Sequence, residues 1–213
     1  MGSFKNKDGK ILVENLIKVI QDNKDYLSKI DGEIGDGDHG INMNKGFSIC
    51  EERIADKAMD LSEALKTLAM VLMMEIGGSM GPLYGTLFIE MSKAAKGEED
   101  IDKQVFYKML NSAVRGIQQL GNAKVGDKTL MDTLVPALEA YKQELDADSD
   151  FTAALEKMCK AAEKGKDSTI DLVAKVGRAS RLGERSRGVL DAGATSCCLI
   201  IQSVAGSIIQ LVK

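Results

Sequence analysis

The chain has 213 residues, of which 44% are hydrophobic, 28% charged and 4% aromatic, a balance typical of one globular domain spanning residues 1–213. Its formal net charge of −4 argues against nucleic-acid binding, which needs a basic surface. We find no apolar run long enough to cross a membrane, and four cysteines without Cys-x-x-Cys spacing indicate reduced thiols in a cytoplasmic protein.

Helical periodicity dominates the chain, and no strand-like alternation of useful length is present. The first predicted helix runs from Ile11 to about Ile30, with Asn6 or Asp8 as its cap. The same spacing predicts further helices over residues 42–54, 61–76, 83–96, 103–120, a stretch that starts after Thr129, and residues 151–164, 168–175 and 195–211. Similar lengths and short connections predict an all-α bundle or barrel.

Several helix ends carry recognisable signals. Asp60 and Glu63 are spaced as a capping box, and Asp102 is expected to cap the helix that follows it. Gly81 and Pro82 are the expected N-cap and first residue of the helix over residues 83–96. Gly165 is expected to end the helix that begins at Phe151.

The stretch from Asp31 to Gly40 holds the strongest chemical signal. It packs three aspartates, Glu33 and the only histidine of the chain into ten residues separated by glycines. Unpaired carboxylates are too costly to bury and repel one another, and a cation between them removes both penalties. Carboxylate oxygens are hard ligands, so the expected ion is Mg²⁺, with Mn²⁺ or Ca²⁺ as substitutes.

Two other motifs do not fit this stretch. Residues 35–40 match Gly-x-Gly-x-x-Gly, but a dinucleotide loop follows a strand, and two aspartates would repel its pyrophosphate. An EF-hand loop starting at Asp31 would need a glutamate at position twelve, where Asn42 stands. A carboxylate cluster that binds phosphate through metal ions, or a solvated acidic turn, remains.

Three more polar stretches lie between predicted helices. Residues 77–82 form either a phosphate-binding glycine loop or a plain turn. The two lysines and two aspartates around residues 124–132 are expected to pair on the surface. Residues 177–188 carry four arginines, suited to polyphosphate oxygens or to a solvated loop. Helices that alternate in direction would bring these stretches and the acidic one to the same rim.

Four motifs in this order resemble the DhaL family, the nucleotide-binding subunits of bacterial dihydroxyacetone kinases. The match covers essentially the whole chain. The motifs are Ile-Gly-Asp-x-Asp-His-Gly-x-Asn-Met from Ile34, Gly-Gly-x-x-Gly-Pro-Leu-Tyr-Gly from Gly77, Gly-Asp-Lys-Thr-x-x-Asp-x-Leu-x-Pro-Ala from Gly126 and Gly-Arg-Ala-Ser-x-Leu-Gly-Glu-Arg-Ser from Gly177.

The resemblance implies an antiparallel barrel of about eight helices with the nucleotide site at one end. It implies that Asp31, Asp36 and Asp38 bind two Mg²⁺ ions, which bridge to the phosphates of ADP or ATP, and that these aspartates and Arg178 are the catalytic residues. The nucleotide contacts that it implies are His39, Gly40, Ile41, Asn42, Ser79, Met80, Gly121, Leu130, Arg178, Asp191, Ala192 and Gly193.

The implied reaction is phosphoryl transfer to dihydroxyacetone held by a separate DhaK subunit. A free-standing chain resembles the phosphotransferase-system version, in which a DhaM subunit rephosphorylates bound ADP from phosphoenolpyruvate, although ATP remains an alternative donor. Ser79-Met80, Arg181, Val189 and Ala192 depart from the family pattern. They leave open another short ketose, such as erythrulose, or an ADP-bound regulatory paralogue that contacts a transcriptional regulator without turnover.

Overall fold

The computed structural model describes residues 2–212, and the prediction of an all-α fold is confirmed. The helices are α1 (Lys10–Asp22), α2 (Lys24–Ile34), α3 (His39–Ile54), α4 (Leu61–Glu75), α5 (Met80–Ala95), α6 (Lys103–Leu120), α7 (Met131–Asp146), α8 (Phe151–Ser168) and α9 (Ala192–Leu211). Short elements complete the chain: strands β1 (Ser3–Lys5) and β2 (Asp100–Asp102), and 3-10 helices η1 (Asn6–Asp8), η2 (Thr169–Asp171) and η3 (Arg178–Ser186).

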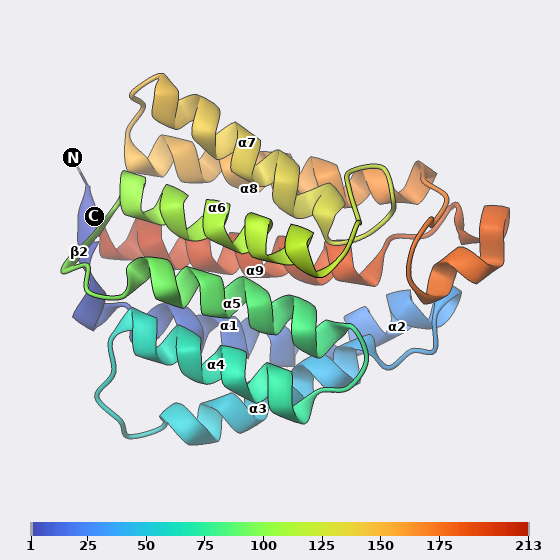
Figure 1. Cartoon of the computed structure of the whole chain (residues 1–213), viewed down its shortest axis with the longest axis horizontal. Coiled ribbons are helices and arrows are strands. Elements are labelled where there is room, and N and C mark those ends of the chain that lie inside the picture. The colour runs from blue at the N-terminus through green and yellow to red at the C-terminus, as the bar shows by residue number, and fades with distance from the viewer. Residues whose placement is uncertain (1, 213) are drawn as a thin grey trace.

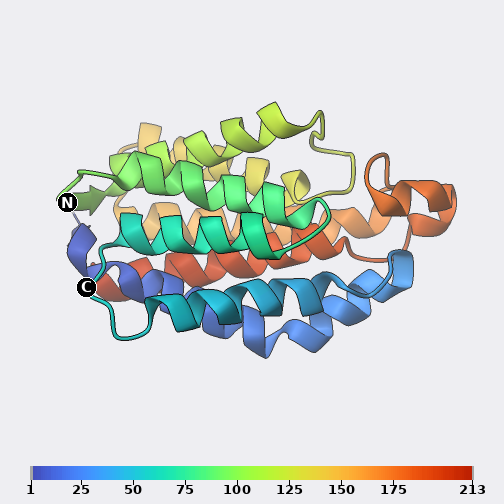
Figure 2. The ribbon, with the colours of Figure 1, turned by 60° about the horizontal axis from the view of Figure 1, so that its bottom comes forward.

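The helices form a closed ring around one continuous hydrophobic core. From α3 to α9 each helix packs against the next one in the chain, and α9 returns to pack against α1, which also contacts α3. Figures 1 and 2 show α9 running along the middle of the molecule between α1 and α8. The ring therefore closes through two helices at opposite ends of the sequence.

Helix α9 corrects one sequence-based expectation. By length and composition it could cross a membrane, with a mean hydropathy of 1.6 in its most apolar window, so the expectation that no run of this kind exists is wrong. In the structure 67% of that window is buried inside the protein. Its apolar character on most sides matches its place in the core of the ring.

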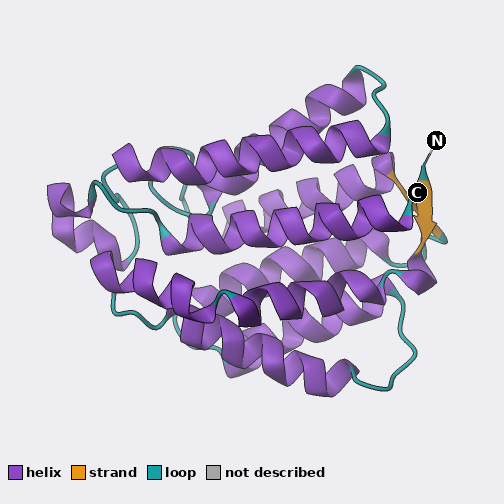
Figure 3. Ribbon diagram, turned by 180° about the vertical axis from the view of Figure 1, so that it is seen from behind, coloured by secondary structure: helices purple, strands orange, loops and turns teal. Residues whose placement is uncertain are grey.

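The two ends of the ring differ. At one end β1 and β2 pair in antiparallel register, with Phe4 opposite Ile101, beside the two described chain ends (Figure 3). At the other end lie the α2–α3, α4–α5 and α6–α7 connections and the long segment between η2 and α9. These are the polar stretches expected on one rim.

Two of the predicted helix starts are confirmed by their caps. In the capping box of α4, the Glu63 amide donates to Asp60 Oδ1 (2.8 Å) and the Asp60 amide donates to Glu63 Oε2 (3.1 Å). Asp102 Oδ1 accepts from the amides of Gln104 and Val105 at the start of α6. Both caps satisfy amides that have no partner inside the helix.

Other boundaries were predicted wrongly. The first helix is broken at Asn23, whose side chain donates to the Val19 carbonyl (2.8 Å), and Asn6 and Asp8 lie in η1 rather than capping it. Helix α5 begins at Met80 with Ser79 as N-cap. Helix α8 continues through Gly165 to Ser168, and the separate helix expected over residues 168–175 is only the 3-10 turn η2. Gly165 is a glycine because α7 packs so closely there that a Cβ would overlap the Asp132 carbonyl.

Candidate functional site

A cavity of about 680 Å³ opens at the loop end of the ring. All four polar stretches contribute to its wall, which confirms that they share one rim. Among the residues that line it are Asp31, Asp36, Asp38, His39, Asn42, Ser79, Met80, Gly121, Leu130, Arg178, Asp191, Ala192 and Gly193, all predicted as site residues.

Two predicted nucleotide contacts do not line this cavity. Gly40 is buried, and a Cβ there would overlap the Lys24 carbonyl and the Ser28 side chain. It is a glycine because α3 starts against the backbone of α2. Ile41 points outward and is 53% exposed. Gly40 therefore allows close packing of α2 and α3, and Ile41 lies on the surface. Neither residue belongs to the cavity wall.

The three predicted metal ligands come together. One carboxylate oxygen from each of Asp31, Asp36 and Asp38 lies within 4.8 Å of the others. Asp31 belongs to the last turn of α2, whose carbonyl end is the negative end of the helix dipole, and Asp38 directly precedes α3. Within residues 2–212 no hydrogen bond is donated to the Asp38 carboxylate, and Asp31 Oδ2 accepts one from the His39 amide (3.3 Å).

These residues fit a divalent cation. They supply hard oxygen donors, are partly exposed, and carry three negative charges. The positive charge paired with them is Arg178 of η3, whose guanidinium forms an ion pair with Asp36. One arginine leaves the cluster with excess negative charge, so bound cations would stabilise this arrangement.

Four helices point their amino ends into the cavity. Residues at the starts of α3, α5, α7 and α9 line it, because helices of alternating direction begin at the same rim. In α3, α5 and α7 the N-cap side chain makes no capping hydrogen bond. The Met131 amide of α7 is nevertheless bonded to Thr129 Oγ1 (3.2 Å). The positive end of each helix dipole favours anions, so this wall suits phosphate groups.

His39 is buried under the acidic cluster rather than exposed beside it. Its Nε2 lies 2.8 Å from Ser196 Oγ, which in turn lies 2.5 Å from the Tyr84 hydroxyl. Tyr84 donates to the Gly193 carbonyl (3.0 Å) at the start of α9. Burial lowers the pKa of His39 to about 4, against the opposing effect of Asp31, so the imidazole is neutral at pH 7. This chain of bonds ties α3, α5 and α9 together under the site.

Asp191 is the N-cap of α9, and its Oδ1 accepts from the Ala194 amide (2.7 Å). Burial raises the pKa of Asp191 to about 7 despite this bond, and nearby Asp132 and Asp31 raise it further while Lys128 lowers it. Asp191 therefore gains and loses a proton near neutral pH.

The residues around 124–132 do not pair on the surface as predicted. Asp132 is 1% exposed, and its two carboxylate oxygens accept from the amides of Gly126 (2.6 Å) and Thr129 (2.7 Å). Lys128 is 2% exposed and donates to backbone carbonyls. The motif thus folds a tight loop at the start of α7, and spacing alone gave no sign that these charges are buried.

Sequence reasoning also missed the apolar part of the cavity wall. This part includes side chains whose helical spacing predicts only a position in the hydrophobic core. They are Pro82 and Leu83 of α5, Ile117 and Leu120 of α6, and Met131 of α7. Each belongs to a helix end that also faces the rim, and this dual position follows from the three-dimensional arrangement. The cavity therefore joins a charged part to an apolar part.

Comparisons with known proteins agree with this geometry. Residues 33–206 match the DAK2 domain family. The chain is 41% identical over 184 residues to the protein named PEP-dependent dihydroxyacetone kinase, ADP-binding subunit DhaL, of Escherichia coli K12, covering 85% of this chain and 87% of that one. It is also 41% identical over 186 residues to the corresponding DhaL of kinase 1 of Listeria innocua, covering 87% and 88%.

A solved structure shares the fold. The dihydroxyacetone kinase of C. freundii, determined in complex with AMP-PNP and Mg²⁺, aligns with a TM-score of 0.68 at 20% identity, over 93% of this chain and 33% of that one. The chain thus spans about a third of that enzyme's length. By sequence and by fold, this chain belongs to the DAK2 domain family, among the DhaL subunits of dihydroxyacetone kinases, which are phosphotransferases.

Proposed function

We propose that this chain holds ADP or ATP through two Mg²⁺ ions and passes a phosphoryl group to dihydroxyacetone, or a related short ketose, bound on a DhaK-type partner. One observation carries the proposal: three clustered carboxylates share a single cavity with four helix N-termini. The carboxylates suit the cations and the helix ends suit the phosphates, as a metal–nucleotide complex requires. The names of the Escherichia coli and Listeria innocua relatives support ADP as the nucleotide.

Different residues of the chain would have different roles in binding and transfer. Asp31, Asp36 and Asp38 would hold the metal ions, which neutralise phosphate charge during transfer. Arg178, which pairs with Asp36, would add positive charge beside the metal ions. The apolar wall formed by α5, α6 and α7 would hold the base. With no acceptor pocket of its own in this proposal, the chain relies on the partner to present the ketose.

The phosphoryl donor would be a DhaM-type subunit that draws on phosphoenolpyruvate. The PEP-dependent relatives, covered along 87% and 88% of their lengths, support this choice over free ATP. In this scheme ADP stays bound and is rephosphorylated in place. The regulatory alternative keeps ADP bound as well but predicts no turnover.

The first test is the ligand content of the purified protein. We expect it to carry about one ADP and about two Mg²⁺ per chain, and we expect Asp36→Ala to lose both, because two carboxylates cannot balance the same charge. Asp146→Ala is the matched control, since Asp146 is an exposed aspartate on α7 that pairs with Lys142. Wild-type protein that binds neither ligand from millimolar Mg-ADP would refute the proposal.

The second test is turnover. The chain is mixed with a DhaK-type subunit from the same organism, dihydroxyacetone or erythrulose, and either ATP or a phosphorylated DhaM-type subunit. Formation of the ketose phosphate from the phosphorylated subunit supports the proposed donor. Bound ADP without turnover of either ketose from either donor would favour the regulatory alternative.

A further inference from the structure

Arg178 reaches the acidic cluster from a long segment whose placement needs an explanation. Residues 173–190, here called the arginine segment, connect η2 to α9 and contain η3. In Figure 1 this segment extends at the cavity end of the molecule, near the end of α2. The Arg178 side chain is 60% exposed, so packing around it does not fix its position.

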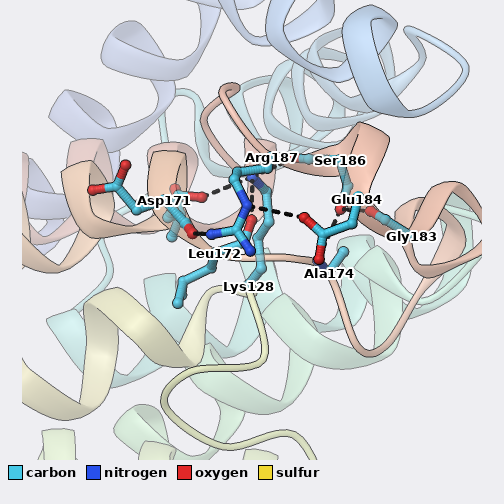
Figure 4. Close-up of polar contacts among 9 residues, drawn as sticks. Lys128, Asp171, Leu172, Ala174, Gly183, Glu184, Ser186 and Arg187 are labelled. Carbon is cyan, nitrogen blue, oxygen red and sulfur yellow. Dashed lines mark hydrogen bonds and ion pairs between the residues drawn. The ribbon is translucent and has the colours of Figure 1, made fainter.

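Lys128 binds both ends of this segment (Figure 4). Its Nζ lies 2.7 Å from the Thr169 carbonyl oxygen and 3.2 Å from that of Leu172, which both precede the segment. The same Nζ lies 2.6 Å from the carbonyl oxygens of Ser186 and Val189, near the segment's other end. An ammonium has three N–H donors, so the four surrounding carbonyl oxygens use all of its hydrogen-bonding capacity.

The cost of this arrangement indicates that it serves a purpose. Lys128 is 2% exposed and has a φ of +63°, in the left-handed region that non-glycine residues rarely adopt. Burial lowers the pKa of its ammonium, and the nearby carboxylates of Asp191, Asp132 and Asp171 partly offset that effect. The charge-assisted hydrogen bonds to the carbonyl oxygens also compensate for the lost water. A buried charge in a strained backbone persists where the surrounding structure requires it.

Further hydrogen bonds hold the two ends of the arginine segment together, at a junction here called the neck. The Ala174 amide donates to Ser186 Oγ (2.9 Å), and the Gly188 amide donates to the Ile170 carbonyl (2.7 Å). The Arg187 guanidinium donates to the Asp171 carbonyl, as Figure 4 shows. The ends of the arginine segment are therefore held together, and Lys128 lies at the centre of these bonds.

Lys128 also connects this neck to the cavity. Lys128 and the next two residues, Thr129 and Leu130, all line the cavity wall, and the Thr129 amide donates to Asp132. The loop at the start of α7 and the arginine segment are thus joined through one ammonium. A displacement of either one would shift the other.

We propose that Lys128 is a positioning residue, whose ammonium holds the neck of the arginine segment closed so that Arg178 stays at Asp36 and the bound nucleotide is retained. The retention part rests on the function proposed above. Lys128 touches no substrate in this proposal. It acts through Arg178 and through the loop that bears Thr129.

The test compares Lys128→Met with Lys93→Met in the 213-residue chain. Lys93 is the matched control, because its side chain is exposed and its ammonium lies 2.6 Å from Glu90 on the same helix, α5, outside this neck. Release of a fluorescent ADP analogue in Mg²⁺ is expected to be at least about tenfold faster in Lys128→Met and unchanged in Lys93→Met. Hydrogen exchange at the Ala174 and Gly188 amides should accelerate in Lys128→Met alone.

A chemical rescue separates the ammonium from general packing. Lys128→Gly accepts the left-handed backbone without strain and leaves a slot for a four-carbon amine. Added n-butylammonium should slow ADP release from Lys128→Gly and leave release from Lys128→Met unchanged. If neither variant folds, Ser186→Ala, which removes the bond from the Ala174 amide, should speed release to a smaller extent.

The failures can be told apart. If the unaltered protein binds no ADP, the proposed function fails and the retention role of Lys128 fails with it. If the unaltered protein retains ADP, and folded Lys128→Met releases it at the same rate with unchanged exchange at Ala174 and Gly188, only the role of Lys128 is overturned. If no Lys128 variant folds, unchanged release from Ser186→Ala overturns it as well.

Discussion

Charged residues at the site fall into two groups with different partners. Asp132 and Lys128 are buried and have backbone groups around them that use their hydrogen-bonding capacity. Asp36 and Asp38 are partly exposed and have few protein partners within the described residues 2–212. Buried charges that are fully bonded build the frame, and the under-bonded carboxylates are the ones available to a ligand.

Asp191→Asn should change the pH dependence of stability. The Asp191 pKa is raised from 3.8 to about 7, so between these values the folded state keeps a proton that the unfolded state has lost. Stability from this group therefore falls as pH rises from 4 to 7 and stays low above that. Asparagine keeps an oxygen for the Ala194 amide and carries no charge.

Urea unfolding of nucleotide-free protein checks this prediction. We expect Asp191→Asn to be more stable than wild type by up to about 4 kcal/mol at pH 8, with the difference shrinking toward pH 4. The comparison at pH 4 is the internal control, because the folded and unfolded states of the wild type then differ least in protonation of Asp191 within this pH range. A difference that does not vary with pH would contradict the raised pKa.

At the scale of elements, the direction of each helix decides what its end can bind. Helices α3, α5, α7 and α9 all begin at the cavity, whereas α2 ends there with Asp31 in its last turn. Amide ends favour phosphate and a carbonyl end favours a cation. The alternating order of the ring thus separates the two kinds of binding group without any special sequence at most positions.

Two glycines within helices should respond in opposite ways to alanine. Gly165 of α8 lies against the Asp132 carbonyl, so Gly165→Ala should destabilise the protein by about 2 kcal/mol and shift the loop before α7. Gly206 of α9 has nothing near its missing Cβ, so Gly206→Ala should stabilise the protein by roughly 0.5–1 kcal/mol. Thermal unfolding of both variants measures the difference, and equal shifts would contradict the close α7–α8 contact.

The sequence predicted elements best where the signal is local. The capping box of α4 and the Asp cap of α6 involve residues within three positions, and both were predicted correctly. Gly165 was misread as a helix end, because its reason for being glycine is a neighbouring helix. The break at Asn23 depends on one side-chain bond that competes with a continuing helix, and propensity does not reveal it.

For the whole molecule, the site joins segments from most of the chain length, so Mg-ADP should stabilise all of it. At a free ligand concentration 100 times the Kd, the expected gain is about 2.7 kcal/mol, or roughly 5–10 °C in Tm. Calorimetry with and without EDTA measures this gain. Amides of the Gly126–Thr129 loop should gain protection from hydrogen exchange, and those of the β1–β2 pair at the far end should change little locally.

How far the site could be predicted also depends on sequence distance. The acidic cluster lies within eight positions and was found directly, and the alternation of helices placed the other loops on its rim. Lys128 was misplaced on the surface, because its carbonyl partners lie 41 to 61 positions further along the chain. No local pattern encodes such bonds, since any residue supplies a carbonyl.

The pairing of α9 with α1 has a consequence for biosynthesis. Because α9 follows α1 to α8 in the chain, it leaves the ribosome after them, and until then the faces of α1 and α8 that pack against α9 have no partner. A nascent chain halted before residue 192 would expose much of its hydrophobic core to chaperones and proteases. Protection of the nascent chain from proteases therefore depends on the synthesis of α9, its most hydrophobic helix, which completes the hydrophobic core.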